Sequence, residues 1–127
     1  MSDNRLIVLQ LPIALVLSII CLFVPAWADF QAGMDAKNRG DFAKALREWQ
    51  PLAEQGEARA QFYLGLMCAF GRGVPLDLVQ AHMWYSLAAG NGHARAALHR
   101  NDLAKEMKPA QIAEAQKRAR EWKPKAP

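Results

Sequence analysis

The chain has 127 residues and a net charge of +4 at neutral pH. This length allows one domain and no more. Most basic residues are scattered, and one cluster consists of Lys117, Arg118, Arg120, Lys123 and Lys125. We interpret this cluster as the solvated face of a helix. The sequence has no motif of a nucleic-acid-binding module.

The first 28 residues have the organisation of a signal peptide. Arg5 precedes an apolar stretch at 11–24, and an Ala-Trp-Ala sequence that ends at Ala28 places small residues where a signal peptidase reads them. We therefore expect cleavage after Ala28 and export to the periplasm or cell envelope. The alternative is an uncleaved anchor for a membrane-anchored structural subunit. Residues 6–27 form a mostly apolar run of 22 residues, and about 20 are needed to cross a bilayer.

An internal repeat is the strongest pattern in the rest of the chain. The segment 41–60 aligns with 77–96 at a spacing of 36 residues, and seven of the twenty aligned positions are identical. The identical pairs are Asp41/Asp77, Ala45/Ala81, Ala53/Ala89, Gly56/Gly92, Ala58/Ala94, Arg59/Arg95 and Ala60/Ala96. A period of this length is typical of a solenoid of stacked helical hairpins.

Each copy of the repeat contains the start and stop signals of a helix. Asp41 and Asp77 directly precede stretches with helical apolar periodicity, where a carboxylate can accept hydrogen bonds from first-turn N–H groups. Gly56 and Gly92 follow these stretches and can adopt the left-handed conformation that ends a helix. Pro51 falls inside the first of the two helices, and we expect it to bend that helix rather than break it.

A further helix is predicted before each of these two. Residues 30–39 lead into a short turn, and residues 58–70 lead into a longer one at 71–76. Gly33 and Gly65 lie within these helices, where a small residue lets the two helices of a hairpin approach closely. The sequence thus predicts two helical hairpins, the second with a longer turn.

The C-terminal part is predicted to cap the array. Residues 97–107 read as one helix, and Pro109 suits the first position of another, whose apolar stripe extends to Trp122. A repeat array ends in a helix with one polar face, and this helix pair fits that role. We expect residues 123–127 to be a disordered tail, so that the repeat domain covers 29–122.

The long turn and the helix after it carry a specific motif. The sequence GRGVP at 71–75 is followed by Asp77, by AxxWY at 81–85 and by AAxxG at 88–92. With these features the second hairpin resembles a Sel-1-like repeat, a relative of the tetratricopeptide repeats. Cys68 departs from the pattern, which usually has a tyrosine there. The resemblance implies an all-α superhelix that holds partner proteins without catalysis, often in the cell envelope.

Four residues are candidates for a catalytic role: Cys68, His82, His93 and His99. A cysteine-dependent hydrolase using Cys68 is the alternative function, and it would need an exposed thiol with a lowered pKa and a nearby histidine. Cys68 instead falls on the packing stripe of its helix, which favours a buried role. His93 and His99 are six residues apart, on opposite faces of a continuous helix, and do not form a metal-ligand pair. We predict no catalytic residue, cofactor or metal site.

The predicted function is a non-enzymatic adaptor or scaffold for a protein partner. By analogy with tetratricopeptide arrays, the first helix of each hairpin lines the concave face. The partner-binding residues predicted on this basis are Lys37, Arg59, Phe62, Leu66 and Phe70. Phe62, Leu66 and Phe70 could form an apolar strip, but the neighbouring hairpin could equally cover it. The ends of the array also allow a homodimer.

Overall fold

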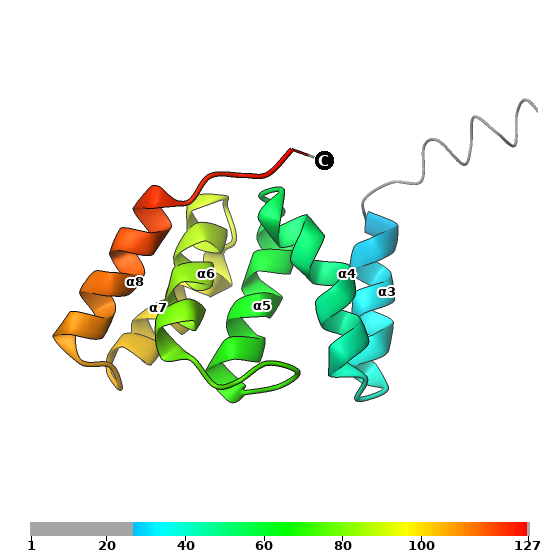
Figure 1. The fold of residues 1–127 in the computed structure, drawn as a ribbon, viewed down its shortest axis with the longest axis horizontal. Coiled ribbons are helices and arrows are strands. Elements are labelled where there is room, and N and C mark those ends of the chain that lie inside the picture. Colours follow the sequence, from blue (N-terminus) through cyan, green and yellow to red (C-terminus); the bar gives the residue numbers. More distant parts are fainter. Residues whose placement is uncertain (1–26, 127) are drawn as a thin grey trace, which may run out of the picture.

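The computed structural model describes residues 27–126. They form six α-helices arranged as three hairpins (Figure 1). The helices are α3 (Trp27–Asn38), α4 (Phe42–Glu54), α5 (Ala58–Phe70), α6 (Leu78–Gly90), α7 (Ala94–Ala104) and α8 (Pro109–Glu121). The hairpins stack side by side along the long axis of the molecule. This arrangement confirms the predicted all-α superhelix of two hairpins and a C-terminal capping pair.

The predicted signal peptide, residues 1–28, lies outside the described residues except for its last two, with which α3 begins. Its cleavage therefore stays a prediction. Within residues 27–126, none of the helices combines the length and the apolar character that crossing a membrane requires.

The predicted helix starts are confirmed at both aspartates. The side chain of Asp41 accepts a hydrogen bond from the Lys44 N–H (3.1 Å), and that of Asp77 accepts one from the Gln80 N–H (3.0 Å). Each carboxylate thus satisfies an N–H group that has no partner within its helix. Helix α4 continues past Pro51 to its end, so the proline does not break it.

The two copies of the repeat also end their second helices in the same way. Gly56 and Gly92 have φ angles of 100° and 95°, in the left-handed region that favours glycine. The next residue in each copy, Glu57 or His93, donates its N–H to the carbonyl five residues earlier, at 3.0 and 2.9 Å. These bonds satisfy carbonyl groups at the helix end and turn the chain into the next hairpin.

In each of the first two hairpins an aromatic ring lies on a glycine of the facing helix. The Trp49 ring of α4 covers Gly33 of α3, and the Tyr85 ring of α6 covers Gly65 of α5. A Cβ atom on Gly65 would lie 2.5 Å from two carbons of the Tyr85 ring. Trp49 is fully buried, and its indole N–H donates to the Phe30 carbonyl (3.1 Å). The close approach predicted at both glycines is confirmed.

A buried amide joins the first hairpin to the second. Gln61 of α5 is fully buried; its Nε2 donates to the Ala53 carbonyl (3.1 Å), and its Oε1 accepts from Asn91 Nδ2 (3.0 Å). Asn91 also donates to the Gly56 carbonyl (3.3 Å). A buried amide is stable only when its polar atoms are bonded, so this network constrains how the two hairpins pack.

The third hairpin begins earlier than predicted. The helix expected at 97–107 is α7, which begins three residues sooner, directly after the turn at Gly92. The cause is His93, whose Nδ1 accepts a hydrogen bond from the Ala96 N–H (3.3 Å) and so caps the helix. Both helices of this hairpin pack on α6, and α8 starts at Pro109 as predicted.

The segment after α8 runs back across the array towards α4 (Figure 1). The Trp122 ring lies 6.5 Å from the Trp84 ring of α6, between ring centres. The Lys125 N–H donates to the Glu54 carbonyl (2.7 Å), and Lys125 Nζ lies 3.2 Å from the Glu54 carboxylate. Lys125, within the stretch 123–127 for which we expected disorder, therefore contacts the end of α4.

The contacts at the helix glycines predict opposite effects for two alanine substitutions. Gly65→Ala should lower the free energy of unfolding by about 1–3 kcal/mol, because the new methyl group has no room beneath the Tyr85 ring. The matched control is Gly90→Ala, since a Cβ atom at this last residue of α6 meets nothing within 4 Å. It should leave stability unchanged or raise it slightly. Urea denaturation measures both, and equal effects would contradict the packing described here.

Candidate protein-binding surface

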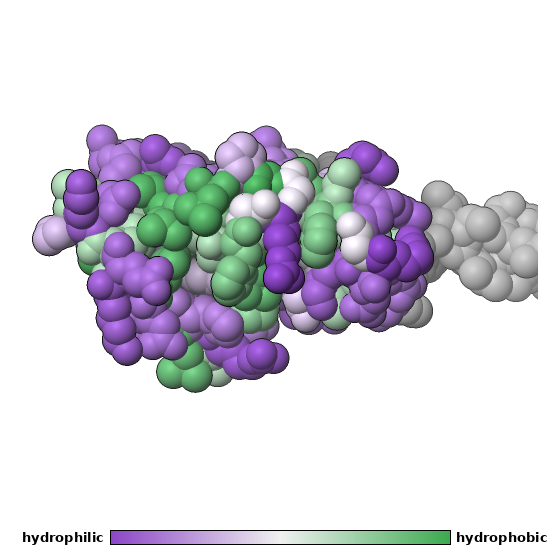
Figure 2. Space-filling view, turned by 90° about the horizontal axis from the view of Figure 1, so that it is seen from below, coloured by the Kyte–Doolittle hydropathy of each residue, from purple (hydrophilic) through white to green (hydrophobic). Residues whose placement is uncertain are grey.

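Phe70, the last residue of α5, is 63% exposed. One hollow lies beside it towards the first hairpin, and a second lies beside it towards α7. We call Phe70 and these two hollows the Phe70 surface. Figure 2 looks onto the end of the molecule where the long turn lies, and it shows hydrophobic residues gathered across the middle with hydrophilic residues around them.

The first hollow, of about 90 Å³, has aromatic walls and two cations. Lys37 Nζ lies 5.5 Å from the centre of the Tyr63 ring, and the Arg72 guanidinium carbon lies 5.7 Å from the centre of the Phe70 ring. Both distances allow attraction between the charge and the face of the ring. The lining residues are Lys37, Phe42, Trp49, Tyr63, Leu66, Met67, Phe70 and Arg72. This hollow suits an apolar side chain with an acidic neighbour.

The second hollow is larger, about 340 Å³, and carries acidic residues. Asp102 of α7 and Glu106 of the following turn line it, and both are exposed. The Asp102 carboxylate forms an exposed ion pair with Lys105 (3.1 Å). The lining residues are Ala69, Phe70, Leu76, Leu78, Tyr85, His99, Asp102, Leu103 and Glu106. The Phe70 surface therefore has a cationic side and an acidic side, separated by an exposed ring.

The long turn after α5 is held in place by backbone hydrogen bonds. The Arg72 N–H donates to the Met67 carbonyl (3.0 Å), and the Asp77 N–H donates to the Cys68 carbonyl (2.9 Å). Gly73 has a φ of 73°, and a Cβ atom there would lie 2.8 Å from the end of the Met67 side chain. The turn thus lies close against α5, which places Arg72 beside Phe70.

Three of the five predicted partner-binding residues lie together on this surface. Lys37, Leu66 and Phe70 all line the first hollow. Arg59 lies at the other end of α5, where its guanidinium carbon is 4.2 Å from the centre of an aromatic ring of α3. Phe62 is only 2% exposed, so the neighbouring hairpin covers it and the apolar strip is not continuous.

Helix geometry explains why Tyr63 belongs to the surface and Phe62 does not. Each residue of an α-helix turns by about 100°, so eight residues from Phe62 to Phe70 leave the two side chains about 80° apart. Seven residues from Tyr63 to Phe70 leave them only about 20° apart. The spacing of seven, rather than eight, was the signal in the sequence that could have identified Tyr63.

Phe62 instead anchors the contact between the second and third hairpins. Its ring centre lies 4.3 Å from that of His93, which stacks on it, and 5.1 Å from that of His99. His93 precedes α7, so the two imidazoles are not on opposite faces of one helix and both pack on the same phenyl ring. Within residues 27–126, no cluster of three or more His, Cys, Asp or Glu side chains is arranged to hold a metal ion.

The His93 imidazole has a capping role that requires its neutral form. Its Nδ1 accepts the Ala96 N–H, and a protonated ring has no free lone pair for this bond. Burial, together with the positive charge of Arg95, lowers the pKa of His93 below its ordinary value. The side-chain cap of α7 therefore needs an uncharged histidine, while the Ala96 N–H also donates to the His93 carbonyl (3.1 Å).

Cys68 and His82, the other two candidates for a catalytic role, are both buried. Burial, with a further contribution from the Asp77 carboxylate, raises the pKa of the Cys68 thiol to about 11. A nucleophilic thiol needs the opposite shift. Burial and the charge of Arg100 lower the pKa of His82, which is consistent with a neutral packing residue.

The second hairpin matches a known repeat. Residues 58–93 match the family model of the Sel1 repeat, which confirms the resemblance over this part of the chain. Chitin synthase regulator SKT5 of Malassezia restricta is 42% identical to this chain over 52 residues, which are 41% of this chain and 4% of that protein. The chain thus spans only a small part of that regulator.

The histidine cap predicts that acid destabilises the protein. Because the pKa of His93 is lower in the folded than in the unfolded chain, the unfolded chain binds more protons as pH falls below about 6.5. The free energy of unfolding should therefore fall with pH in that range, and His82 shifts it in the same direction.

Replacing His93 with asparagine tests this, because asparagine caps helices and does not titrate. We expect His93→Asn to lose less stability than the wild type between pH 7.5 and pH 5, measured by urea denaturation at each pH. An identical loss in both proteins would show that the cap does not contribute.

Proposed function

We propose that this chain is a non-enzymatic adaptor that binds a segment of a partner protein on the Phe70 surface, in the periplasm or cell envelope. Sel1 repeats generally mediate protein–protein interaction, and residues 58–93 match one. The name of the similar fungal protein describes a regulator of an enzyme rather than the enzyme itself. The raised pKa of the Cys68 thiol also favours a non-catalytic role.

The exposed ring of Phe70, between hollows of opposite charge, is the observation that carries the proposal. Covering such a side chain contributes about 1.5–3 kcal/mol to binding. The fitting partner segment places apolar side chains in both hollows. It carries an acidic residue near Lys37 and Arg72 and a basic residue near Asp102 and Glu106. Complementary charges of this kind set the direction of the bound segment and increase the association rate.

A pair of aspartate substitutions tests the binding surface. Phe70→Asp should abolish capture of partner proteins from an envelope extract, because a carboxylate replaces the central apolar contact. Leu98→Asp is the matched control, since Leu98 is 65% exposed and lines neither hollow. Both changes are at exposed positions, so stability should stay within about 0.5 kcal/mol of the wild type. The proposal is wrong if Phe70→Asp captures the same proteins, or if Leu98→Asp loses them as well.

The compartment is tested separately, on the processed protein. We expect the exported product to begin at Asp29, because the small residues that end at Ala28 suit a signal peptidase. Amino-terminal sequencing of the product, with fractionation of the cells, measures this. A product in the membrane fraction that retains residues 1–28 would instead support the membrane-anchored alternative.

A further inference from the structure

A third cavity, of about 270 Å³, lies between α4, α5, α6 and the long turn. It shares Met67 with the first hollow and Leu76 with the second, but Phe70 and the residues of α3 and α7 do not line it. The inference below does not depend on the proposed function. Its size is informative, because an apolar cavity of about 150 Å³ in another protein is large enough to bind benzene. There is room here for one substituted aromatic ring.

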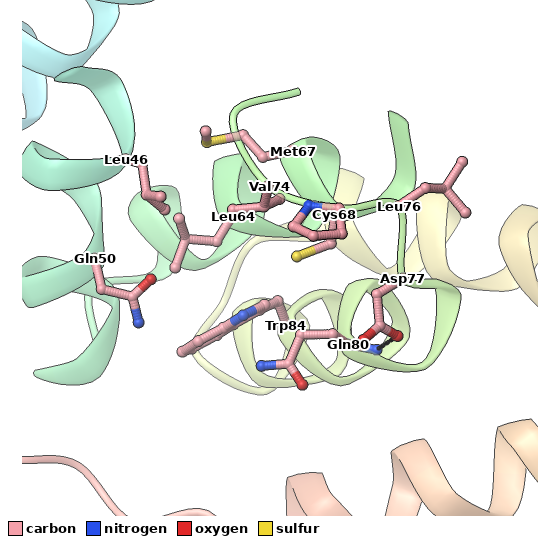
Figure 3. Close-up of a pocket in the computed structure, with 11 residues that line it drawn as sticks. Leu46, Gln50, Leu64, Met67, Cys68, Val74, Leu76, Asp77, Gln80 and Trp84 are labelled. Atoms are coloured by element: carbon pink, nitrogen blue, oxygen red, sulfur yellow. Dashed lines mark hydrogen bonds between the residues drawn. The ribbon is translucent and has the colours of Figure 1, made fainter. Parts of the chain in front are cut away.

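The inner part of the cavity is apolar and rich in sulfur and π electrons. Leu64 and Met67 of α5 line it, and the Cys68 sulfur and the Trp84 indole point into it (Figure 3). Trp84 is 5% exposed and is supported from α8 by the ring of Trp122. Indole faces and sulfur atoms both interact favourably with an aromatic ring. A planar aromatic group therefore suits these walls better than an aliphatic one.

Two amides add a hydrogen-bond acceptor and a donor. Gln50 Nε2 donates to the Glu54 carboxylate (2.8 Å), and its Oε1 has no bond within residues 27–126. Gln80 Oε1 accepts from the Arg118 guanidinium (3.3 Å), and its Nε2 has no bond within the same range. Both side chains line the cavity. A hydroxyl group can donate to the first amide and accept from the second.

The charge of the lining limits the ligand further. Asp77 is the one charged residue among those that line the cavity, and its Oδ1 accepts the Gln80 N–H. No lysine or arginine lines it. The Arg118 guanidinium lies behind the Gln80 amide and is not among the lining residues, so a carboxylate ligand would meet the charge of Asp77 first.

We propose that this cavity binds the ring of a neutral phenol, either a free phenol or a tyrosine side chain of another polypeptide. The ring lies between the Trp84 indole and the Cys68 sulfur, and the hydroxyl bonds to the carboxamides of Gln50 and Gln80. The apolar walls select the ring, the two amides select the hydroxyl, and Asp77 disfavours an anion.

Binding of p-cresol to the full-length protein tests the site. We expect a saturable NMR shift of the Trp84 indole N–H with p-cresol and none with p-toluate. Absence of a saturable shift, or equal binding of p-toluate, overturns the proposal.

Two variants show where the ligand binds. Cys68→Phe should fill the cavity and abolish the p-cresol shift. Gln50→Leu keeps the shape but removes the acceptor, so it should weaken p-cresol about fivefold and leave toluene unchanged. Because Gln50 is partly exposed, we expect Gln50→Leu to fold, and it tests the site if Cys68→Phe does not fold. Equal weakening of the two ligands, or of neither, contradicts the hydrogen bond to the hydroxyl.

The two sources of the phenol are distinguished with N-acetyltyrosinamide. If it produces the same Trp84 shift as p-cresol, the mouth of the cavity admits a ring attached to a peptide backbone, and the ligand is a tyrosine side chain. If p-cresol alone binds, the ligand is a free phenol. If neither binds, the cavity is not a phenol site.

Discussion

The contact of an aromatic ring with a helix glycine, Trp49 on Gly33 and Tyr85 on Gly65, sets the distance between the two helices of the first two hairpins. A side chain at either glycine would push the helices apart, and the neighbouring layers would lose their contacts. The same rings also shape the surface. Trp49 stacks on Tyr63 with ring centres 4.7 Å apart, and both line the first hollow beside Phe70.

Stacking of one hairpin on the next depends on different chemistry. The Gln61 amide network joins the first hairpin to the second, and the stack of Phe62 on His93 joins the second to the third. Both use a polar group that must be bonded, so packing between hairpins is more sensitive to substitution than an entirely apolar contact. Only the contact with His93 is also sensitive to pH, because the Gln61 amide does not titrate. The Phe70 surface includes residues of all three hairpins, so its shape depends on how they stack.

The long turn at 71–77 accounts for most of what distinguishes the second hairpin from the first. Arg72 lines the first hollow, Leu76 lines both the second hollow and the third cavity, and Val74 and Asp77 line that cavity. A single insertion in a regular array thus contributes walls to all three hollows. This is possible because the turn is bonded back to α5 and does not extend into solvent.

The 36-residue period, the aspartate caps and the glycines could be predicted from the sequence, because they depend on hydrogen bonds and close contacts between residues that recur at fixed spacing. The three-dimensional packing was needed to show that Phe62 is covered while Tyr63 and Phe70 face a hollow. It also showed that His93 caps α7 and that Lys125 returns to α4. The way in which the next hairpin crosses a helix decides which face of that helix is covered. Packing between residues far apart in the chain sets this crossing.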